Sequence, residues 1–156
     1  FVLDGYRIFS NIEDTLERGV AIYIIEDKSH LVTKLEPDSN FQEQTWIKLQ
    51  MKGGDKLVVG CLYRSGSGDA ENNENLNELI SLVASDDPSH LLISGDFNYR
   101  GIDWEDNTAT NAEEESFIEC VHGKLLVTAR HRSHKVQIRT TAQHARPDPH
   151  ERRGHD

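Results

Sequence analysis

Asp96 and Asn98 are two polar residues whose side chains could take part in a reaction. They come just after the apolar run at residues 91–93 and the pair Ser94-Gly95. If the chain stays extended there, side chains two residues apart point to the same side. A carboxylate beside an amide can orient an attacking water molecule, and a carboxylate can also bind Mg²⁺. The alternative is an Asx turn, in which both side chains only satisfy backbone amides at a strand end. The spacing alone favours the turn.

A second apolar run, residues 57–62, ends in Tyr63 and Arg64. Both runs have the composition of buried strands, and open α/β folds tend to place ligands and reactive groups where such strands end. We therefore expect Tyr63 and Asp96 to lie on one rim of a sheet. Taken alone, Tyr63 is better explained as an aromatic residue that caps the core.

Other segments predict the elements that must position these residues. Segment 19–25 is apolar and β-branched, which predicts a buried strand, and 30–35 is a candidate for its hairpin partner. Gly53-Gly54-Asp55 predicts a turn into the following strand. The predicted strands are residues 19–25, 30–35, 44–50, 56–63 and 90–94.

Two helices are predicted on either side of the strand 90–94. Apolar residues between Glu71 and Ser85 recur at the spacing of one helix face, and Asn72 or Asn73 could cap that helix. A second helix fits residues 111–121, with Asn111 as its cap and acidic residues in its first turn. Strands that alternate with helices predict an α/β domain.

Composition limits the function further. At 156 residues the chain fits one domain or part of one. No apolar run is as long as a membrane span, so we expect no membrane partner. Cys61 and Cys120 lack metal-ligand spacing and are expected to be reduced core thiols rather than a disulfide, which mildly favours an intracellular protein.

The charge balance changes abruptly after residue 121. Residues 1–121 hold 9 Lys and Arg against 24 Asp and Glu, a net charge of −15, whereas residues 122–156 hold 8 against 3 and six of the eight histidines. The tail shows neither helix nor strand periodicity, so we expect it to be disordered. A nucleic-acid-binding arm and a metal-binding histidine stretch are alternatives that lack defined spacing.

Five segments, taken in order, resemble the endonuclease/exonuclease/phosphatase superfamily. More narrowly, they resemble the endonuclease domain of non-LTR (LINE-type) retrotransposon polyproteins, over about residues 4–121. The segments are Gly19-Val20-Ala21-Ile22-Tyr23, Trp46-Ile47-Lys48, Val59-Gly60-Cys61-Leu62-Tyr63-Arg64, Gly95-Asp96-Phe97-Asn98 and Ile102-Asp103-Trp104.

The resemblance implies a four-layer α/β sandwich that cleaves DNA phosphodiesters with Mg²⁺. Asp96 would activate the attacking water or support the metal-bound phosphate, with a role in metal binding. Asn98 would orient Asp96 and contact the phosphate, and Tyr63 would bind or polarise the scissile phosphate. In an intact element the domain would precede a reverse transcriptase and act in the nucleus. Trp46 and Trp104 are expected to pack, and His30 and His90 to have no role.

Parts of the family pattern are missing. The family has an early Asn and a metal-binding Glu on strands that would precede Phe1, and a late Ser-Asp-His that this sequence lacks. We therefore expect a partial domain at residues 1–121 that is catalytically inactive as it stands. Two alternatives stay open: another phosphodiesterase or phosphatase of the same superfamily, and a non-catalytic remnant or interaction module.

The tail has a second explanation in its codons. If the permitted codons are translated one base later, the segment from Gln143 onward can encode Asn-Thr-Leu-Asp-Leu-Ile-Leu-Thr-Asn, which resembles the Leu-Asp-Leu strand of retrotransposon endonucleases. We therefore hypothesise a frameshift near residues 121–123, so that residues 122–156 are an out-of-frame translation.

Overall fold

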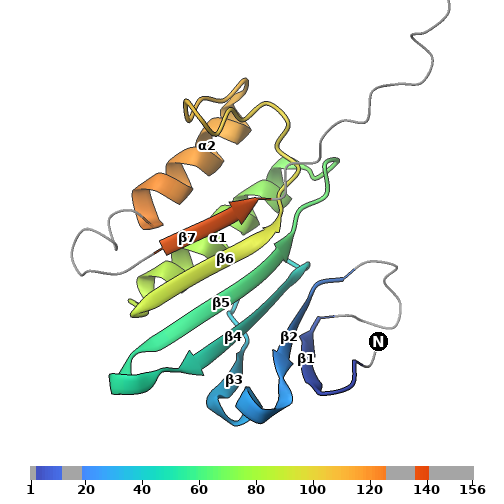
Figure 1. Cartoon of the computed structure of the whole chain (residues 1–156). Coiled ribbons are helices and arrows are strands. Elements are labelled where there is room, and N and C mark those ends of the chain that lie inside the picture. Colours follow the sequence, from blue (N-terminus) through green and yellow to red (C-terminus); the bar gives the residue numbers. More distant parts are fainter. Residues whose placement is uncertain (1–2, 12–18, 126–135, 141–156) are drawn as a thin grey trace, which may run out of the picture.

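The computed structural model describes residues 3–11, 19–125 and 136–140, which form β-strands and helices (Figure 1). The strands are β1 (Tyr6–Ser10), β2 (Ala21–Ile25), β3 (Val32–Leu35), β4 (Gln44–Gln50), β5 (Lys56–Tyr63), β6 (His90–Asp96) and β7 (Val136–Thr140). The α-helices are α1 (Ala70–Ser85) and α2 (Ala112–Cys120), and the shorter helical segments are η1 (Glu26–Leu31), η2 (Lys52–Gly54) and η3 (Val121–Leu125).

A mixed five-stranded sheet is the centre of the described part, with the strand order β3-β4-β5-β6-β7. The first three strands are antiparallel, and β6 and β7 continue parallel to β5. Parallel neighbours need a crossover connection, and α1 and α2 provide the crossovers on one face of the sheet. This connectivity brings the carboxyl ends of β5 and β6 to the same edge.

The main core lies between this sheet and the two helices. It contains fully buried side chains from all of these layers, including Trp46 of β4, Leu76 of α1, Ile93 of β6 and Phe117 of α2. Gly60 of β5 pairs with Trp46, and a Cβ atom at Gly60 would overlap the Trp46 ring. The predicted packing role of Trp46 is confirmed.

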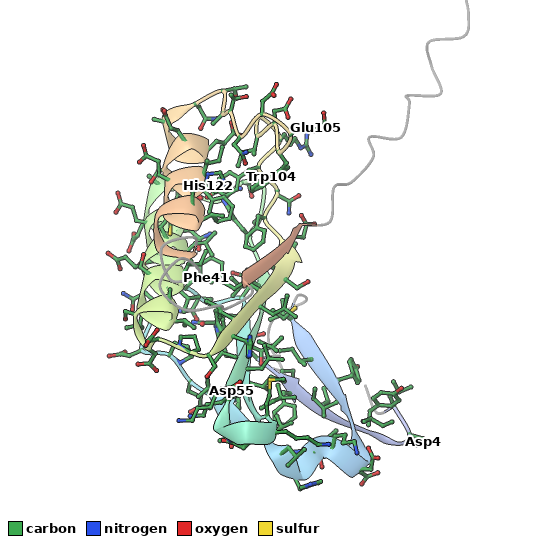
Figure 2. All side chains as sticks on the ribbon, turned by 60° about the vertical axis from the view of Figure 1, so that its left-hand side comes forward. Asp4, Phe41, Asp55, Trp104, Glu105 and His122 are labelled. Carbon is green, nitrogen blue, oxygen red and sulfur yellow. The ribbon has the colours of Figure 1, made fainter. Side chains whose placement is uncertain are left out.

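The opposite face of the sheet packs against the two-stranded antiparallel sheet of β1 and β2. Phe9, Val32 and Ile47 are buried there, with Ile22 and Ile24 of β2 packed against them. Figure 2 shows α1 and α2 on one side of the five-stranded sheet, and β1 and β2 on the other. The described residues therefore form three layers, and the predicted α/β class is confirmed.

The strand predictions hold best in the centre of the sheet. The ranges 44–50 and 56–63 are β4 and β5 as predicted, and the strand at 90–94 extends to Asp96. The prediction for residues 19–25 is wrong in two respects. The strand β2 pairs with β1 instead of β3, and its outward side chains Tyr23 and Ile25 are 38% and 50% exposed. A two-stranded sheet buries only one face, which composition alone does not reveal.

Both helices begin at side-chain caps. The carboxylate of Asp69 accepts a hydrogen bond from the Asn72 backbone amide at 2.9 Å, so the predicted cap at Asn72 or Asn73 is wrong. The predicted cap of α2 is confirmed, because Asn111 Oδ1 accepts from the Glu114 amide at 3.0 Å. The Asn73 side chain does not cap α1 and is buried instead.

The prediction of no regular structure after residue 121 is wrong for two short segments. Residues 121–125 form η3, and Val136–Thr140 pairs with β6 as β7. Apolar residues at 136 and 138 alternate with polar ones, and such a segment can complete the open edge of β6. The rest of the predicted disordered tail lies outside the described residues, and the predicted domain boundary at residue 121 stays a prediction. Within the described residues, no helix has the length and apolar character needed to span a membrane.

Candidate functional site

Tyr63 and Asp96 are register partners at the carboxyl ends of the parallel strands β5 and β6. Leu62, one residue before Tyr63, and Ile93, three residues before Asp96, face the helices. Because side chains alternate along a strand, Tyr63 and Asp96 point to the other face together. The Arg64 amide donates to the Asp96 carbonyl at 2.9 Å and closes this end of the ladder. The expectation that Tyr63 and Asp96 share one rim is therefore confirmed.

Asn98 reaches the same rim through a turn rather than an extended chain. Its backbone has φ 52°, in the left-handed region, where Asn is one of the few tolerated residues besides Gly. Its amide donates to Asp96 Oδ1 at 3.3 Å, and its side-chain Nδ2 donates to the Arg64 carbonyl at 2.8 Å. The predicted extended spacing is wrong, and the Asx-turn geometry is present. Within the described residues, no hydrogen bond is formed by Asp96 Oδ2, which leaves one carboxylate oxygen for a ligand.

Arg64 lies behind this turn and is only 4% exposed. Its Nη1 donates to the carbonyls of Phe97 and Asn98, at 3.2 and 3.4 Å, and its guanidinium lies 3.9 Å from the centre of the Tyr99 ring. A buried cation is tolerated only when its donors are satisfied and it meets an electron-rich partner. The backbone carbonyls and the aromatic face supply both.

Asn73 joins Arg64 to the helices. Its Oδ1 accepts from Arg64 Nε at 2.6 Å and from the Tyr99 hydroxyl at 3.4 Å, while its Nδ2 donates to Glu113 Oε2 at 2.9 Å. Burial raises the pKa of the Tyr99 hydroxyl, and the nearby Arg64 acts in the opposite direction. This hydrogen-bond network therefore links α1, α2 and the ends of both central strands.

The loop after the turn is fastened to α2 by the buried carboxylate of Glu114. Its oxygens accept hydrogen bonds from the Gly101 amide at 2.8 Å, the Thr110 hydroxyl at 2.8 Å and the Thr110 amide at 3.3 Å. Burial alone would raise the pKa of Glu114, but these hydrogen bonds together hold it below its ordinary value. Trp104, on this loop, lies edge-on to Phe117 with ring centres 6.4 Å apart. Figure 2 shows Trp104 at the end of the sheet opposite Asp55, which precedes β5.

A polar cavity of about 410 Å³ adjoins the turn. It lies between the loop after β5, the residues that follow Asn98, and the first turn of α2. Its charged lining residues are Arg64, Arg100, Glu113 and Glu114. Two positive and two negative side chains balance there, so the cavity has no overall charge preference.

The described residues do not complete a metal site. Asp96 Oδ2 is a hard oxygen ligand of the type that Mg²⁺ takes. Within the part of the chain that the structure describes, however, no three His, Cys, Asp or Glu side chains lie together in a group that could hold a metal. Asp96 can thus supply one ligand to a Mg²⁺ ion, and the other ligands are not among the described residues.

The remaining candidates lie away from this edge. His30 is exposed in η1, and His90 lies at the start of β6, where its Nε2 is 3.7 Å from Asp55 Oδ2. Both cysteines are half-buried and free, as predicted, and burial raises the pKa of the Cys61 thiol.

Sequence reasoning missed the roles of Arg64, Asn73 and Glu113. One signal was present for Asn73, which lies three and seven residues before Leu76 and Ile80 and so shares the buried face of α1. A polar residue on an apolar helix face needs a buried partner. The identity of that partner depends on the tertiary structure.

Comparison with known families agrees with this architecture. A family model described as endonuclease-reverse transcriptase matches residues 57–148, which include β5, α1, β6 and α2. The chain belongs to the endonuclease-reverse transcriptase family. The match continues past the charge boundary at residue 121. Comparisons with curated proteins and with solved structures gave no significant match.

Proposed function

We propose that the rim formed by Tyr63, Asp96 and Asn98 is part of the active site of a Mg²⁺-dependent DNA endonuclease from a LINE-type retrotransposon. The observation that carries the proposal is the pairing of Tyr63 with Asp96 at the carboxyl ends of two parallel strands. The family match covers both strands and the turn between Asp96 and Asn98.

Each side chain has a role that its chemistry permits. Asp96 Oδ2 accepts a proton from the attacking water or supports the metal-bound phosphate. Asn98 fixes the Asp96 carboxylate through its backbone amide, at 3.3 Å from Oδ1. The Tyr63 hydroxyl donates a hydrogen bond to a phosphate oxygen, where negative charge builds up during cleavage. When bound, Mg²⁺ neutralises that charge.

The acidic surface restricts how DNA approaches. Residues 1–121 carry a net charge of −15, and both helices carry acidic residues in their first turns. Phosphates are repelled by such a surface and bind where Lys, Arg or a metal ion compensates their charge. DNA therefore contacts the rim of β5 and β6 rather than the helix layer.

We also propose that residues 1–156 do not cleave DNA by themselves. Among the described residues, no group of three His, Cys, Asp or Glu side chains could hold a metal ion, and groups that act together in catalysis lose nearly all activity when one is missing. A plasmid-nicking assay with Mg²⁺ or with chelator tests this. Wild type should match Asp96→Ala in the assay. Nicking that requires Mg²⁺ and disappears in Asp96→Ala would contradict inactivity while supporting the nuclease assignment.

A non-catalytic interaction module is the second candidate, and one observation favours it. The Asx turn at Asp96 and Asn98 accounts for both residues through local hydrogen bonds. The two candidates differ in Asp96 Oδ2, which an interaction module does not need. Asp96→Asn keeps an acceptor for the Asn98 amide but removes the charge. For a nuclease this change should abolish cleavage by any longer active form, whereas a module should keep its stability and binding.

The reading frame of residues 122–156 decides whether they belong to the protein. The frameshift near residues 121–123 stays a hypothesis, and two observations bear against it: β7 lies in the tail, and the family match runs to residue 148. Sequencing the transcript across codons 115–156 tests it. A shifted frame that continues into Ser-Asp-His and a reverse transcriptase would support the hypothesis, and clean support for the printed frame would refute it.

A further inference from the structure

Arg64 contacts the Asp96–Asn98 turn with both its backbone and its side chain. Its amide donates to the Asp96 carbonyl at 2.9 Å, and its carbonyl accepts from Asn98 Nδ2 at 2.8 Å. Its guanidinium donates to the carbonyls of Phe97 and Asn98. All three residues of the turn are thus bonded to Arg64, the residue that directly follows the neighbouring strand β5.

The side chain of Arg64 is itself fixed from the other side. Asn73 Oδ1 accepts from its Nε at 2.6 Å, and the Tyr99 ring stacks under its guanidinium. The Asn73 amide has only one orientation that satisfies its neighbours. Arg64 and Tyr99 present donors, so the oxygen faces them, and Glu113 presents an acceptor, so the nitrogen faces it.

Arg64 contacts the turn residue that has the unusual backbone conformation, Asn98. Asn98 has a left-handed backbone, a sparsely populated conformation that Asn tolerates better than most residues other than Gly. Such conformations persist only where surrounding contacts hold them. The guanidinium binds the carbonyls of the two peptide groups that flank the Asn98 Cα atom, and a change of the Asn98 backbone conformation would rotate these carbonyls.

We propose that Arg64, held by Asn73, is a positioning residue that keeps Asp96 and Asn98 in the conformation in which they face the substrate. The assignment of substrate rests on the proposed function, but the positioning of the turn does not. A planar guanidinium donates in several fixed directions and stacks on the Tyr99 ring, whereas a lysine ammonium is a point charge on a flexible stem and does not reproduce this geometry. The position therefore requires Arg.

The experiment measures the turn directly, in the full chain of residues 1–156, by nuclear magnetic resonance. Two signals report on it: the chemical shifts of the Asn98 side-chain amide, and the hydrogen exchange rate of the Asn98 backbone amide. In Arg64→Lys the side-chain signals should move to the position of a solvent-exposed amide. Backbone exchange at Asn98 should become about tenfold faster or more, because charge-assisted hydrogen bonds are lost.

A matched control separates positioning from general destabilisation. Val83→Ala removes buried core atoms on α1 and lowers overall stability without a change at the turn. It should leave the Asn98 shifts unchanged. Identical shifts in wild type and Arg64→Lys, or equal changes in Arg64→Lys and Val83→Ala, would overturn the proposal.

A second pair of variants decides the matter if Arg64→Lys does not fold. Asn73→Leu removes the acceptor for Arg64 Nε, and the Asn98 signals should change. The double variant Asn73→Asp with Glu113→Gln restores an acceptor for Arg64 and reverses the donor and acceptor between positions 73 and 113, so the wild-type signals should return. No recovery in the double variant, or no change in Asn73→Leu, would refute positioning through Asn73. Absence of DNA cleavage by a longer form would refute the nuclease assignment and leave these signals unaffected.

Discussion

Arg64 and Asn98 bind each other in both directions across the ends of β5 and β6. The Asn98 side chain donates to the Arg64 carbonyl at 2.8 Å, and Arg64 Nη1 donates to the Asn98 carbonyl at 3.4 Å. This reciprocal contact bridges two strands that are parallel neighbours and far apart in sequence. The contact fixes Asn98, which lies two residues after Asp96, the candidate catalytic carboxylate.

Substitutions of Asn98 should distinguish the contribution of its side-chain hydrogen bond to stability from the contribution of its backbone conformation. In Asn98→Gly the left-handed backbone is retained without strain, but the bond to Arg64 is lost, so stability should fall by about 1 kcal/mol. In Asn98→Ala the same bond is lost and backbone strain is added, for a total of about 2 kcal/mol. Urea denaturation measures both. Equal stability of the Gly and Ala variants would contradict the strained turn.

Gly95 should tolerate no side chain. A Cβ atom at this position would overlap the backbone carbonyl oxygen of Leu62 on the paired strand. Backbone cannot move aside without opening the ladder, so Gly95→Ala should cost about 3 kcal/mol or prevent folding. Gly66→Ala is the matched control, because its added atom meets only Asn98 Cβ at 3.7 Å. Thermal melting compares the two variants, and a stable Gly95→Ala protein would refute the close approach.

The buried carboxylate of Glu114 should make stability depend on pH. Because its folded pKa lies below the ordinary value of 4.5, the stabilisation is present above that value and is lost as pH falls through the folded pKa. Glu114→Gln should be less stable than wild type by about 2 kcal/mol at pH 7, since hydrogen bonds to the charged group are weakened.

The measurement for Glu114 is denaturant unfolding of both proteins between pH 7 and pH 3. The difference between them should shrink as the pH drops below 4.5. Glu115→Gln, an exposed neighbour on α2, should show little difference at any pH. A constant difference between wild type and Glu114→Gln over the whole range would contradict the assignment.

The outer face of β1 and β2 should promote self-association. Tyr6, Tyr23 and Ile25 are 44%, 38% and 50% exposed on paired strands, and contiguous exposed apolar side chains are an aggregation hazard. Tyr23→Thr with Ile25→Thr places strand-favouring β-branched residues at both positions and should raise the monomeric fraction. Size-exclusion chromatography with light scattering measures it. Leu82→Thr, at a single exposed apolar residue on α1, is the control, and an equal gain from it would argue against this surface.

The sequence predicted the central strands better than the outer ones. Strand β5 carries a nearly uninterrupted apolar run because both of its faces are covered, and the bounds of β4 and β5 agree with the prediction. The strand β1 was missed, and the partner of β2 was predicted wrongly, since strand pairing depends on contacts between distant segments. Sequence patterns predict where strands lie better than they predict which strands pair.

The candidate site was likewise predictable in part. The runs that end at Tyr63 and Asp96 indicated a shared rim, and the structure confirms it. The left-handed turn at Asn98 and the contact between Arg64 and Asn73 were not predictable, because each depends on side chains from different elements. Only the buried position of Asn73 on α1 hinted at a polar partner.

The most direct test of the nuclease assignment is plasmid nicking by the longest protein that the locus encodes with residues 1–121 in frame. Nicking should depend on Mg²⁺ and should fall by about a thousandfold or more in Asp96→Ala, as for the loss of a group that acts in a catalytic unit. Met51→Ala, at an exposed residue between β4 and β5 at the opposite end of β5 from Tyr63, should nick like wild type. Nicking that survives Asp96→Ala, or a longer protein that binds DNA without cutting it, would contradict the assignment of Asp96 to a nuclease active site.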